Sequence, residues 1–187
     1  LRPEITPEKA PAITLLMALA AEEGIRKLSG LDTLIKWPND VVAEGKKLCG
    51  ILTEMSADLD GVRYVVTGAG INVNQEKFPP ETPNASSMRL LSGRTFRRAE
   101  LIGLVLEAFE KYYGIFMKTG DMSGLKEAYE ARLANRDREV RVLEEKPWQG
   151  IARGIDERGE LLVEDQEGVI RTVLSGEVSV RGIYGYV

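Results

Sequence analysis

The chain has 187 residues, 43% of them hydrophobic, which suits one ordinary domain, or a medium domain with a small second one, and excludes general disorder. Its 25 basic and 29 acidic residues give a net charge of -4, which excludes a broad basic surface for nucleic acid. With no histidine and a single cysteine, Cys49, the chain cannot form catalytic triads, histidine zinc sites, internal disulfides or cysteine metal clusters. This cysteine usage fits a reducing, cytoplasmic compartment.

The first third of the chain predicts one helix followed by an antiparallel sheet. With Thr6 as its cap and Pro7 in its first turn, the helix runs to Ser29, and its apolar stripe comprises Ile13, Leu16, Met17 and Ala20. Strand-like runs follow at 33–37, 41–42, 47–55 and 62–73. Their connections are too short for crossover helices, so we expect antiparallel hairpins. The apolar stretch 13–21 is too short to span a bilayer, so we expect no membrane partner.

The remainder predicts a loop, two helices and a second set of strands. Residues 74–95 contain three prolines and predict a long irregular loop, of the kind that covers ligands or stays disordered. Helical stripes follow over 99–118 and 125–133. Short alternating runs then occur at 139–143, 149–155, 160–163, 169–173 and 177–181. We therefore expect an α+β fold with a mixed or antiparallel sheet and packed helices in residues 1–135, and a small β-barrel in 136–187.

Two common nucleotide motifs are absent from the glycine-rich segments. Gly68-Ala69-Gly70 lacks a third glycine and precedes a strand-like run, so it is not a dinucleotide fingerprint. Gly45-Lys46-Lys47 lacks the upstream glycine and the Ser or Thr of a P-loop. Nucleotide binding, if present, must use another arrangement.

Three other segments carry residues suited to a pocket: 36–40, 47–52 and 68–72. Pro38 fixes a turn that presents Asn39 and Asp40, and a carboxylate there suits Mg²⁺ or a ribose hydroxyl. Glycines within strands, such as Gly50, expose the backbone to a close ligand, and the adjacent cation of Lys47 suits a carboxylate or phosphate. The same residues equally suit solvated lysines, a turn and strand bulges. The residues alone therefore indicate an α+β domain with a pocket of unassigned function.

Taken together, in this order and spacing, the segments resemble the central domain of biotin protein ligases. The matching motifs are Lys-Trp-Pro-Asn-Asp at 36–40, Lys-Leu-x-Gly-Ile-Leu-x-Glu at 47–54 and Gly-x-Gly-Ile-Asn at 68–72. The resemblance extends from Leu1-Arg2-Pro3, through the segment 84–87, to 176–179 near the end of the chain. It implies a biotin ligase fold, similar to class II synthetases, with a C-terminal SH3-like domain.

The resemblance also implies an activity and roles for individual residues. The family forms biotinyl-5'-AMP from biotin and ATP, with Mg²⁺, and transfers biotin to a lysine of a biotin carboxyl carrier protein of a carboxylase. Lys47 matches the catalytic cation, and Asp40 is also the expected Mg²⁺ contact. The implied biotin-binding residues are Lys47, Gly50, Leu52, Gly68, Gly70 and Ile71. The implied nucleotide-binding residues are Lys36, Asn39, Asp40 and Asn72, with the loop 74–87 closing over adenine.

Alternative functions stay open at this point. In the family a glycine- and arginine-rich loop precedes the segment that matches Leu1-Arg2-Pro3, so we expect a ligase fragment without that loop and without nucleic acid binding of its own. Such a fragment suits a non-catalytic module that forms a homodimer or docks the carrier through a sheet edge. A lipoate ligase shares the general fold, but its pocket motifs differ from those at 47–52 and 68–72. Biotin is therefore the favoured ligand.

Overall fold

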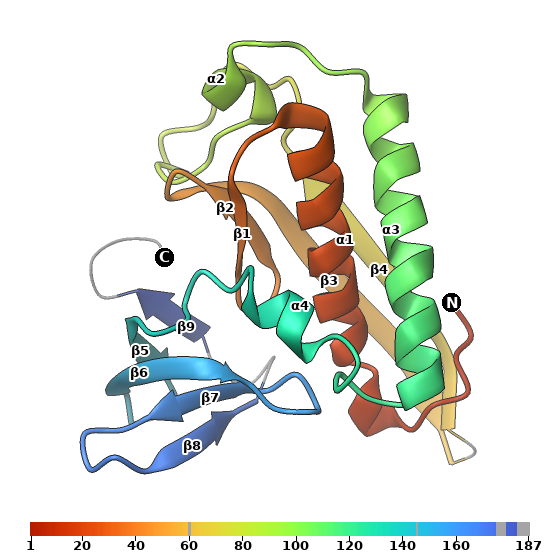
Figure 1. Ribbon diagram of the computed structural model, residues 1–187, viewed down its shortest axis with the longest axis vertical. Helices are drawn as coiled ribbons and strands as arrows, with labels where there is room; N and C mark the ends of the chain where they lie inside the picture. Colours follow the sequence, from red (N-terminus) through yellow and green to blue (C-terminus); the bar gives the residue numbers. More distant parts are fainter. Residues whose placement is uncertain (60, 145, 175–178, 183–187) are drawn as a thin grey trace.

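The computed structural model describes residues 1–59, 61–144, 146–174 and 179–182, which form helices and two antiparallel sheets (Figure 1). The first sheet has the order β1-β2-β3-β4, so each strand pairs with its neighbour in sequence. Its strands are β1 (Thr33–Lys36), β2 (Asp40–Ala43), β3 (Lys46–Asp58) and β4 (Gly61–Ile71). The α+β fold class and the antiparallel hairpins predicted from short connections are confirmed.

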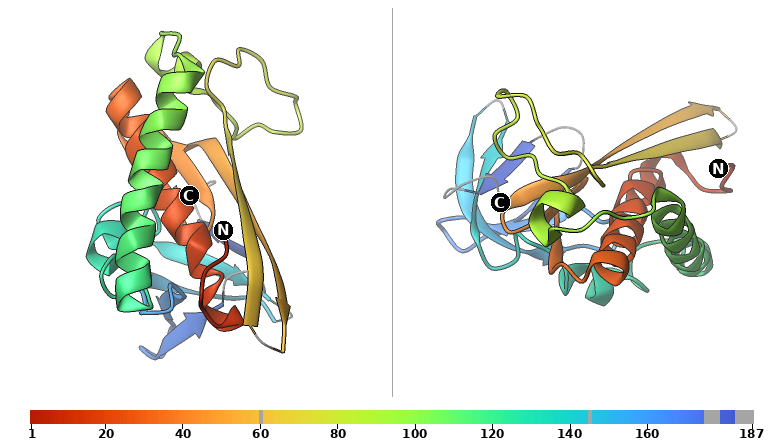
Figure 2. Two further views of the ribbon diagram at one scale, coloured as in Figure 1. Left: turned by 90° about the vertical axis from the view of Figure 1, so that its right-hand side faces the viewer. Right: turned by 90° about the horizontal axis from the view of Figure 1, so that it is seen from above.

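Two long helices cover one face of this sheet (Figures 1 and 2). Helix α1 (Ala12–Ser29) packs on the strands, and α3 (Arg98–Thr119) packs along α1. Because the sheet, α3 and the segment around Gly159 all pack against α1, this helix is buried on nearly all sides, not only along the predicted stripe. The predicted start at Thr6 is wrong. Residues Pro7–Lys9 form a separate 3-10 turn, η1, and Pro11, which has no N–H to leave unpaired, takes the N-cap position of α1.

Two buried carboxylates join α1 to its neighbours. Glu22 accepts a hydrogen bond of 2.9 Å from the Thr33 hydroxyl of β1, and Glu23 accepts one from the Tyr112 hydroxyl of α3. Burial raises the pKa of Glu23, but the hydrogen bonds from Lys27 and Tyr112 outweigh this, so that the pKa lies below its ordinary value. Both helices are therefore held by charge-assisted bonds as well as apolar packing.

The predicted loop 74–95 contains a short helix, α2 (Met88–Ser92), which corrects the irregular assignment. The Ser87 hydroxyl caps it by accepting a hydrogen bond of 3.1 Å from the Leu90 amide, and Gly93 ends it in the left-handed conformation. The cap signal was present in the sequence, but a five-residue helix is too short to show apolar periodicity.

The second sheet has the order β8-β7-β6-β5-β9 and forms the small SH3-like β domain. Its strands are β5 (Glu139–Leu143), β6 (Trp148–Ile155), β7 (Leu161–Glu164), β8 (Ile170–Val173) and β9 (Ser179–Gly182). Glu177 and Val178, predicted to start the last strand, lie outside the described residues, as does most of the segment 176–179.

The predicted third helix is much shorter than its stripe suggested. Helix α4 spans only Lys126–Glu130, and Leu133 instead forms a parallel bridge with Ile35 of β1. The Ile35 amide donates to the Arg132 carbonyl at 2.7 Å, and the Ala134 amide donates to the Ile35 carbonyl at 2.8 Å. This tertiary pairing replaces the helical hydrogen bonds, and it ties the segment leading to the second sheet onto the first.

No helix in the described part of the chain is long and apolar enough to cross a membrane.

The close approach of α1 and α3 gives a test of the packing. A methyl group at Gly24 would lie 2.6 Å from Val105 Cγ2 and 3.3 Å from the Val105 nitrogen, whereas one at Gly103 would meet no described atom within 4 Å. We expect Gly24→Ala to lower the free energy of unfolding by about 1–3 kcal/mol through overpacking. Gly103→Ala, on the exposed face of α3, should raise it by about 0.5–1 kcal/mol. Urea denaturation of both variants measures the difference, and equal shifts would contradict the packing.

Candidate active site

A single row of residues crosses all four strands of the first sheet and brings the three sequence motifs together. Lys36 of β1 is paired with Asp40 of β2, Asp40 with Gly50 of β3, and Gly50 with Gly70 of β4. Direct partners on antiparallel strands point to the same face. One cation, one anion and two glycines therefore lie side by side on one face of the sheet.

The neighbouring row shows which face this is. Ile35, Val41 and Cys49 are fully buried, and Ile71 completes their row on β4. Because side chains alternate along a strand, this row faces the helices and the first row faces away from them. The structure thus does not place the Ile71 side chain with the other predicted biotin contacts. It packs against the core and lines an apolar cavity of about 320 Å³ between β4 and α3.

Lys47 joins the first row through an irregularity in the pairing of β2 with β3. Val41 is paired with Cys49 but Val42 with Lys47, so one extra residue, Leu48, enters β3 at this point. The Lys47 ammonium forms an ion pair of 2.5 Å with Asp40 Oδ1. A Cβ at Gly50 would lie 3.0 Å from both Cε and Nζ of Lys47. Glycine at position 50 therefore makes room for the lysine to lie across the strand.

The glycines provide a flat surface next to this ion pair. A Cβ at Gly68 would meet no described atom within 4 Å, and one at Gly70 would meet only the Gly50 carbonyl, at 3.7 Å. Leu52, paired with Gly68, is 67% exposed on the same face. A ligand lying on this surface would contact bare backbone and an exposed leucine, with a cation at one end. The arrangement suits a molecule with an apolar body and an anionic end.

Asn39 is hydrogen-bonded to β3 within the protein. Its side-chain amide donates to the Ile51 carbonyl, and the Ile51 amide donates to the Asn39 carbonyl, both at 2.9 Å. These two bonds fasten the turn after Pro38 to β3. The turn also borders a cavity of about 280 Å³, which Leu52 of β3 and Pro11 at the start of α1 line from the other sides. The Asn39 amide group therefore serves the shape of the site, and its nucleotide contact stays a prediction.

The loop after β4 begins at Asn72 and returns to Lys47. The Lys47 amide donates to the Asn84 carbonyl at 2.7 Å, and the Ser86 amide donates to the Lys47 carbonyl at 2.9 Å. Between these ends most of residues 75–84 are exposed and project on the side of the sheet away from α1 and α3 (Figure 2). The loop is thus anchored at the candidate catalytic lysine and projects on the same side of the sheet as the first row.

Cys49 lies within the same motif, but its side chain points away from the first row. It is fully buried on the helix side of β3. Burial, and then the negative charge of Asp40, raise the pKa of the Cys49 thiol to about 12. A thiol in this state is not a nucleophile at neutral pH.

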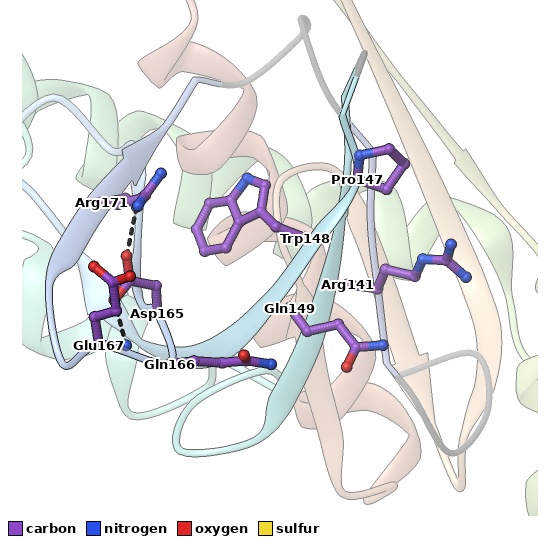
Figure 3. Close-up of a pocket in the computed structure, with 8 residues that line it drawn as sticks. All are labelled: Arg141, Pro147, Trp148, Gln149, Asp165, Gln166, Glu167 and Arg171. Carbon is purple, nitrogen blue, oxygen red and sulfur yellow. Dashed lines mark hydrogen bonds and ion pairs between the residues drawn. The ribbon is translucent and has the colours of Figure 1, made fainter.

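A larger cavity, of about 530 Å³, lies on the second sheet (Figure 3). Two of its charged side chains are paired: Arg171 forms an ion pair of 2.6 Å with Asp165 and lies 5.5 Å from the centre of the Trp148 ring. The first sheet holds the unusual combination of a cation and bare glycine backbone, so we place the candidate site there. No group of three or more acidic or cysteine side chains among the described residues is arranged to hold a metal ion.

Sequence reasoning missed what holds the first motif in place. The Trp37 amide donates to Asn135 Oδ1, and its indole N–H donates to the Gly159 carbonyl, each at 3.0 Å. These partners are 98 and 122 residues away in the chain. No local pattern in the sequence signals contacts at such a distance.

Comparison with known families divides the chain in two. The family described as biotin/lipoate A/B protein ligase matches residues 1–72, and the biotin protein ligase C-terminal domain matches residues 137–181. The first description covers both biotin and lipoate enzymes, but the second is specific to biotin protein ligases.

Individual relatives point the same way. The bifunctional ligase/repressor BirA of Bacillus spizizenii is 43% identical over 185 residues, and that of Escherichia coli is 30% identical over 182. Each match covers 96% of this chain but 56% of the relative, so the chain spans just over half the length of these curated relatives.

Solved structures agree with this assignment. The crystal structure of biotin protein ligase from Aquifex aeolicus has a TM-score of 0.82 and 30% identity, over 94% of this chain and 77% of that one. The same ligase in complex with biotin and ATP has a TM-score of 0.82 and 29% identity, over 95% of this chain and 75% of that one. By these matches in sequence and structure, the chain belongs to the biotin protein ligase family.

Proposed function

We propose that this chain carries the biotin and adenylate surface of an ATP-dependent ligase that joins biotin to a lysine of a biotin carboxyl carrier protein. The observation that carries the proposal is the row Lys36, Asp40, Gly50 and Gly70, with Lys47 lying across it. The surface fits biotin because it offers a bare, partly apolar area that ends at a cation. The biotin and ATP complexes of the Aquifex ligase support this proposal.

In the first step, a carboxylate oxygen of biotin attacks the α-phosphorus of ATP. The bond from that phosphorus to the oxygen shared with the β-phosphate breaks, and pyrophosphate leaves with the bonding electrons. Lys36, Lys47 and Asp40 together carry one net positive charge, so the site offsets the negative charge that gathers where carboxylate and phosphate meet. Lys47 is the catalytic cation in this proposal because, of the two lysines, it is the one that lies across Gly50.

In the second step, the amine of the carrier lysine attacks the acyl carbon of biotinyl-5'-AMP. The bond from carbon to phosphate oxygen breaks, AMP leaves, and the amine releases a proton to solvent. Lys47 stays beside the departing phosphate and stabilises its charge. The loop 74–87 limits water at the mixed anhydride, which would otherwise hydrolyse.

We assign the nucleotide-binding roles according to the contacts that each residue makes within the protein. Asn72 lies where the loop leaves β4, and its backbone N–H donates to the Leu48 carbonyl at 2.8 Å. Because it follows Gly70 by two residues, we assign its side chain to adenylate held above Gly70. Asp40 already binds Lys47, and a single carboxylate does not make a resident Mg²⁺ site. We therefore assign Mg²⁺ to the phosphates of the ATP substrate. Lys36 is buried, is paired with Asp40 and adds a positive charge to the row.

Further expectations concern domains and partners. We infer a catalytic unit in residues 1–135 and an SH3-like unit in 136–187, supported by the C-terminal family match over 137–181. A homodimer formed through sheet edges is a further proposal. The relatives named as biotin ligases favour the enzyme over a non-catalytic docking module and over a lipoate ligase.

The role of Lys47 is tested by its replacement. Lys47→Ala in the full-length protein should slow biotin-dependent pyrophosphate release at least tenfold, about 1.4 kcal/mol of barrier, because the cation beside the reacting groups is lost. The matched control is Lys46→Ala. The ammonium of Lys46 donates to the Pro83 carbonyl of the loop at 3.0 Å, away from Asp40, so its loss should cost less. Equal losses at the two positions would contradict the assignment.

Glycine 50 is tested by adding a side chain. Gly50→Val should push Lys47 from its place across the strand and weaken biotin binding at least tenfold, measured by calorimetry, while the thermal midpoint moves little. Gly68→Ala is the companion variant: its methyl group meets no described atom of the protein, so it should weaken only ligand binding. Normal biotin binding by both variants would show that these glycines serve only the strand structure and do not contact biotin.

Hydrogen exchange tests the loop. The amides of residues 75–84 should exchange quickly in the free protein and slow at least tenfold when a non-hydrolysable biotinyl-adenylate analogue is bound. The Lys47 and Ser86 amides, already hydrogen-bonded between β3 and the loop, serve as internal references that stay protected. Unchanged exchange at 75–84 in the saturated protein would show that the loop is a spacer.

A further inference from the structure

The indole of Trp37 connects the second sheet to the candidate site. Trp37 is 1% exposed, and its Nε1 donates to the Gly159 carbonyl in the turn between β6 and β7. On the backbone side, its amide donates to Asn135 Oδ1. Trp37 is therefore held at two points by segments that lie about a hundred residues further along the chain.

The turn that follows Trp37 transmits this position to the active groups. Only Pro38 and Asn39 separate Trp37 from Asp40, and Asn39 is fastened to Ile51 by two hydrogen bonds of 2.9 Å. Asp40 in turn holds the Lys47 ammonium at 2.5 Å. The path from the Trp37 indole to Lys47 therefore runs through a short turn fixed at both ends.

The acceptor at the other end is equally constrained. Asp156 Oδ1 accepts hydrogen bonds of 2.9 Å from the amides of Arg158 and Glu160, which shapes the turn. Gly159 has a φ of +87°, and a Cβ there would lie 2.7 Å from Leu15 Cδ2 of α1. The Gly159 carbonyl is thus presented to Trp37 by a rigid turn seated against α1.

We propose that the turn 156–160 of the second sheet is a positioning element for catalysis, and that Trp37 is the positioning residue through which it sets Asp40 and Lys47. The proposal rests on the proposed ligase function. It assigns the C-terminal sheet a direct part in the geometry of the charged row, beyond its own folding.

The indole N–H is the part of Trp37 that distinguishes positioning from packing. Phenylalanine would fill much of the same space but leave the buried Gly159 carbonyl without its donor. The turn from Trp37 to Asp40 would then lose its fixed point on the second sheet. We therefore expect Trp37→Phe to act on the Lys47–Asp40 ion pair, over and above any loss of stability.

Kinetics provide the first test. Trp37→Phe in the full-length protein, assayed well below its thermal midpoint, should lower kcat for pyrophosphate release at least fivefold and change KM for biotin by less than twofold. Trp148→Phe is the matched control, because it removes the other of the two tryptophans, from the cavity on the second sheet. It should leave both constants within twofold of the wild type. A normal kcat in a folded Trp37→Phe protein would overturn the proposal.

Chemical labelling gives a second test that needs no activity. The Asp40 carboxylate shields the Lys47 ammonium, so acylation of Lys47 by acetic anhydride, read by peptide mass spectrometry, should be at least threefold faster in Trp37→Phe. The rate at Lys46 should be unchanged. Asp156→Ala removes the side chain that accepts the two hydrogen bonds of the turn, and it should also speed acylation of Lys47 at least threefold. It is the test variant if Trp37→Phe does not fold. Arg158→Ala, at an exposed position of the same turn, should leave the acylation rate of Lys47 unchanged.

These tests separate the two proposals. A wild-type protein that releases no pyrophosphate would contradict the ligase function, and the labelling rates would still decide the positioning. Faster labelling of Lys47 in Trp37→Phe and Asp156→Ala, but not in Trp148→Phe or Arg158→Ala, would support the positioning element. Unchanged labelling of Lys47 in both folded test variants would overturn it.

Discussion

The register of the first sheet is the constraint on which the candidate site depends. Side chains alternate along a strand, so a slip of one residue between β2 and β3 would turn Gly50 toward the helices and bring Cys49 to the open face. The buried row from Ile35 to Ile71 prevents this slip, because it must remain under α1. Apolar burial on one face thus fixes which polar groups meet on the other.

The open face combines features that would be liabilities in an ordinary sheet. Glycines weaken strands, and an exposed leucine such as Leu52 contributes little hydrophobic free energy to folding. Lys47 lies across Gly50 and is held in place by one carboxylate, Asp40. Because the row also contains Lys36, its net charge stays positive. A surface that stays bare and keeps a net cation is costly for stability and suited to an anionic ligand.

The second sheet and the loop are each attached to this surface at a different residue. The loop returns to the backbone of Lys47 through Asn84 and Ser86, while the turn at Gly159 reaches the motif through Trp37. The loop is attached by main-chain hydrogen bonds, and Trp37 by its indole N–H to the Gly159 carbonyl, so both attachments hold position without adding charge. The row is therefore tied to one segment that is largely exposed and to another that is packed against α1.

The sequence by itself determined the α+β class, the antiparallel hairpins, the long helices and the three motifs, because periodicity and short connections are local properties. It also brought together Lys36, Asp40, Lys47 and Gly50 as one set. Tertiary structure alone decided that Ile71 faces the core, that Asn39 binds Ile51, and that Leu133 leaves its helix to pair with Ile35. Each of these depends on a partner from another strand or a distant segment, and a hydrogen bond across 122 residues, such as that from Trp37 to Gly159, leaves no periodic trace in the chain.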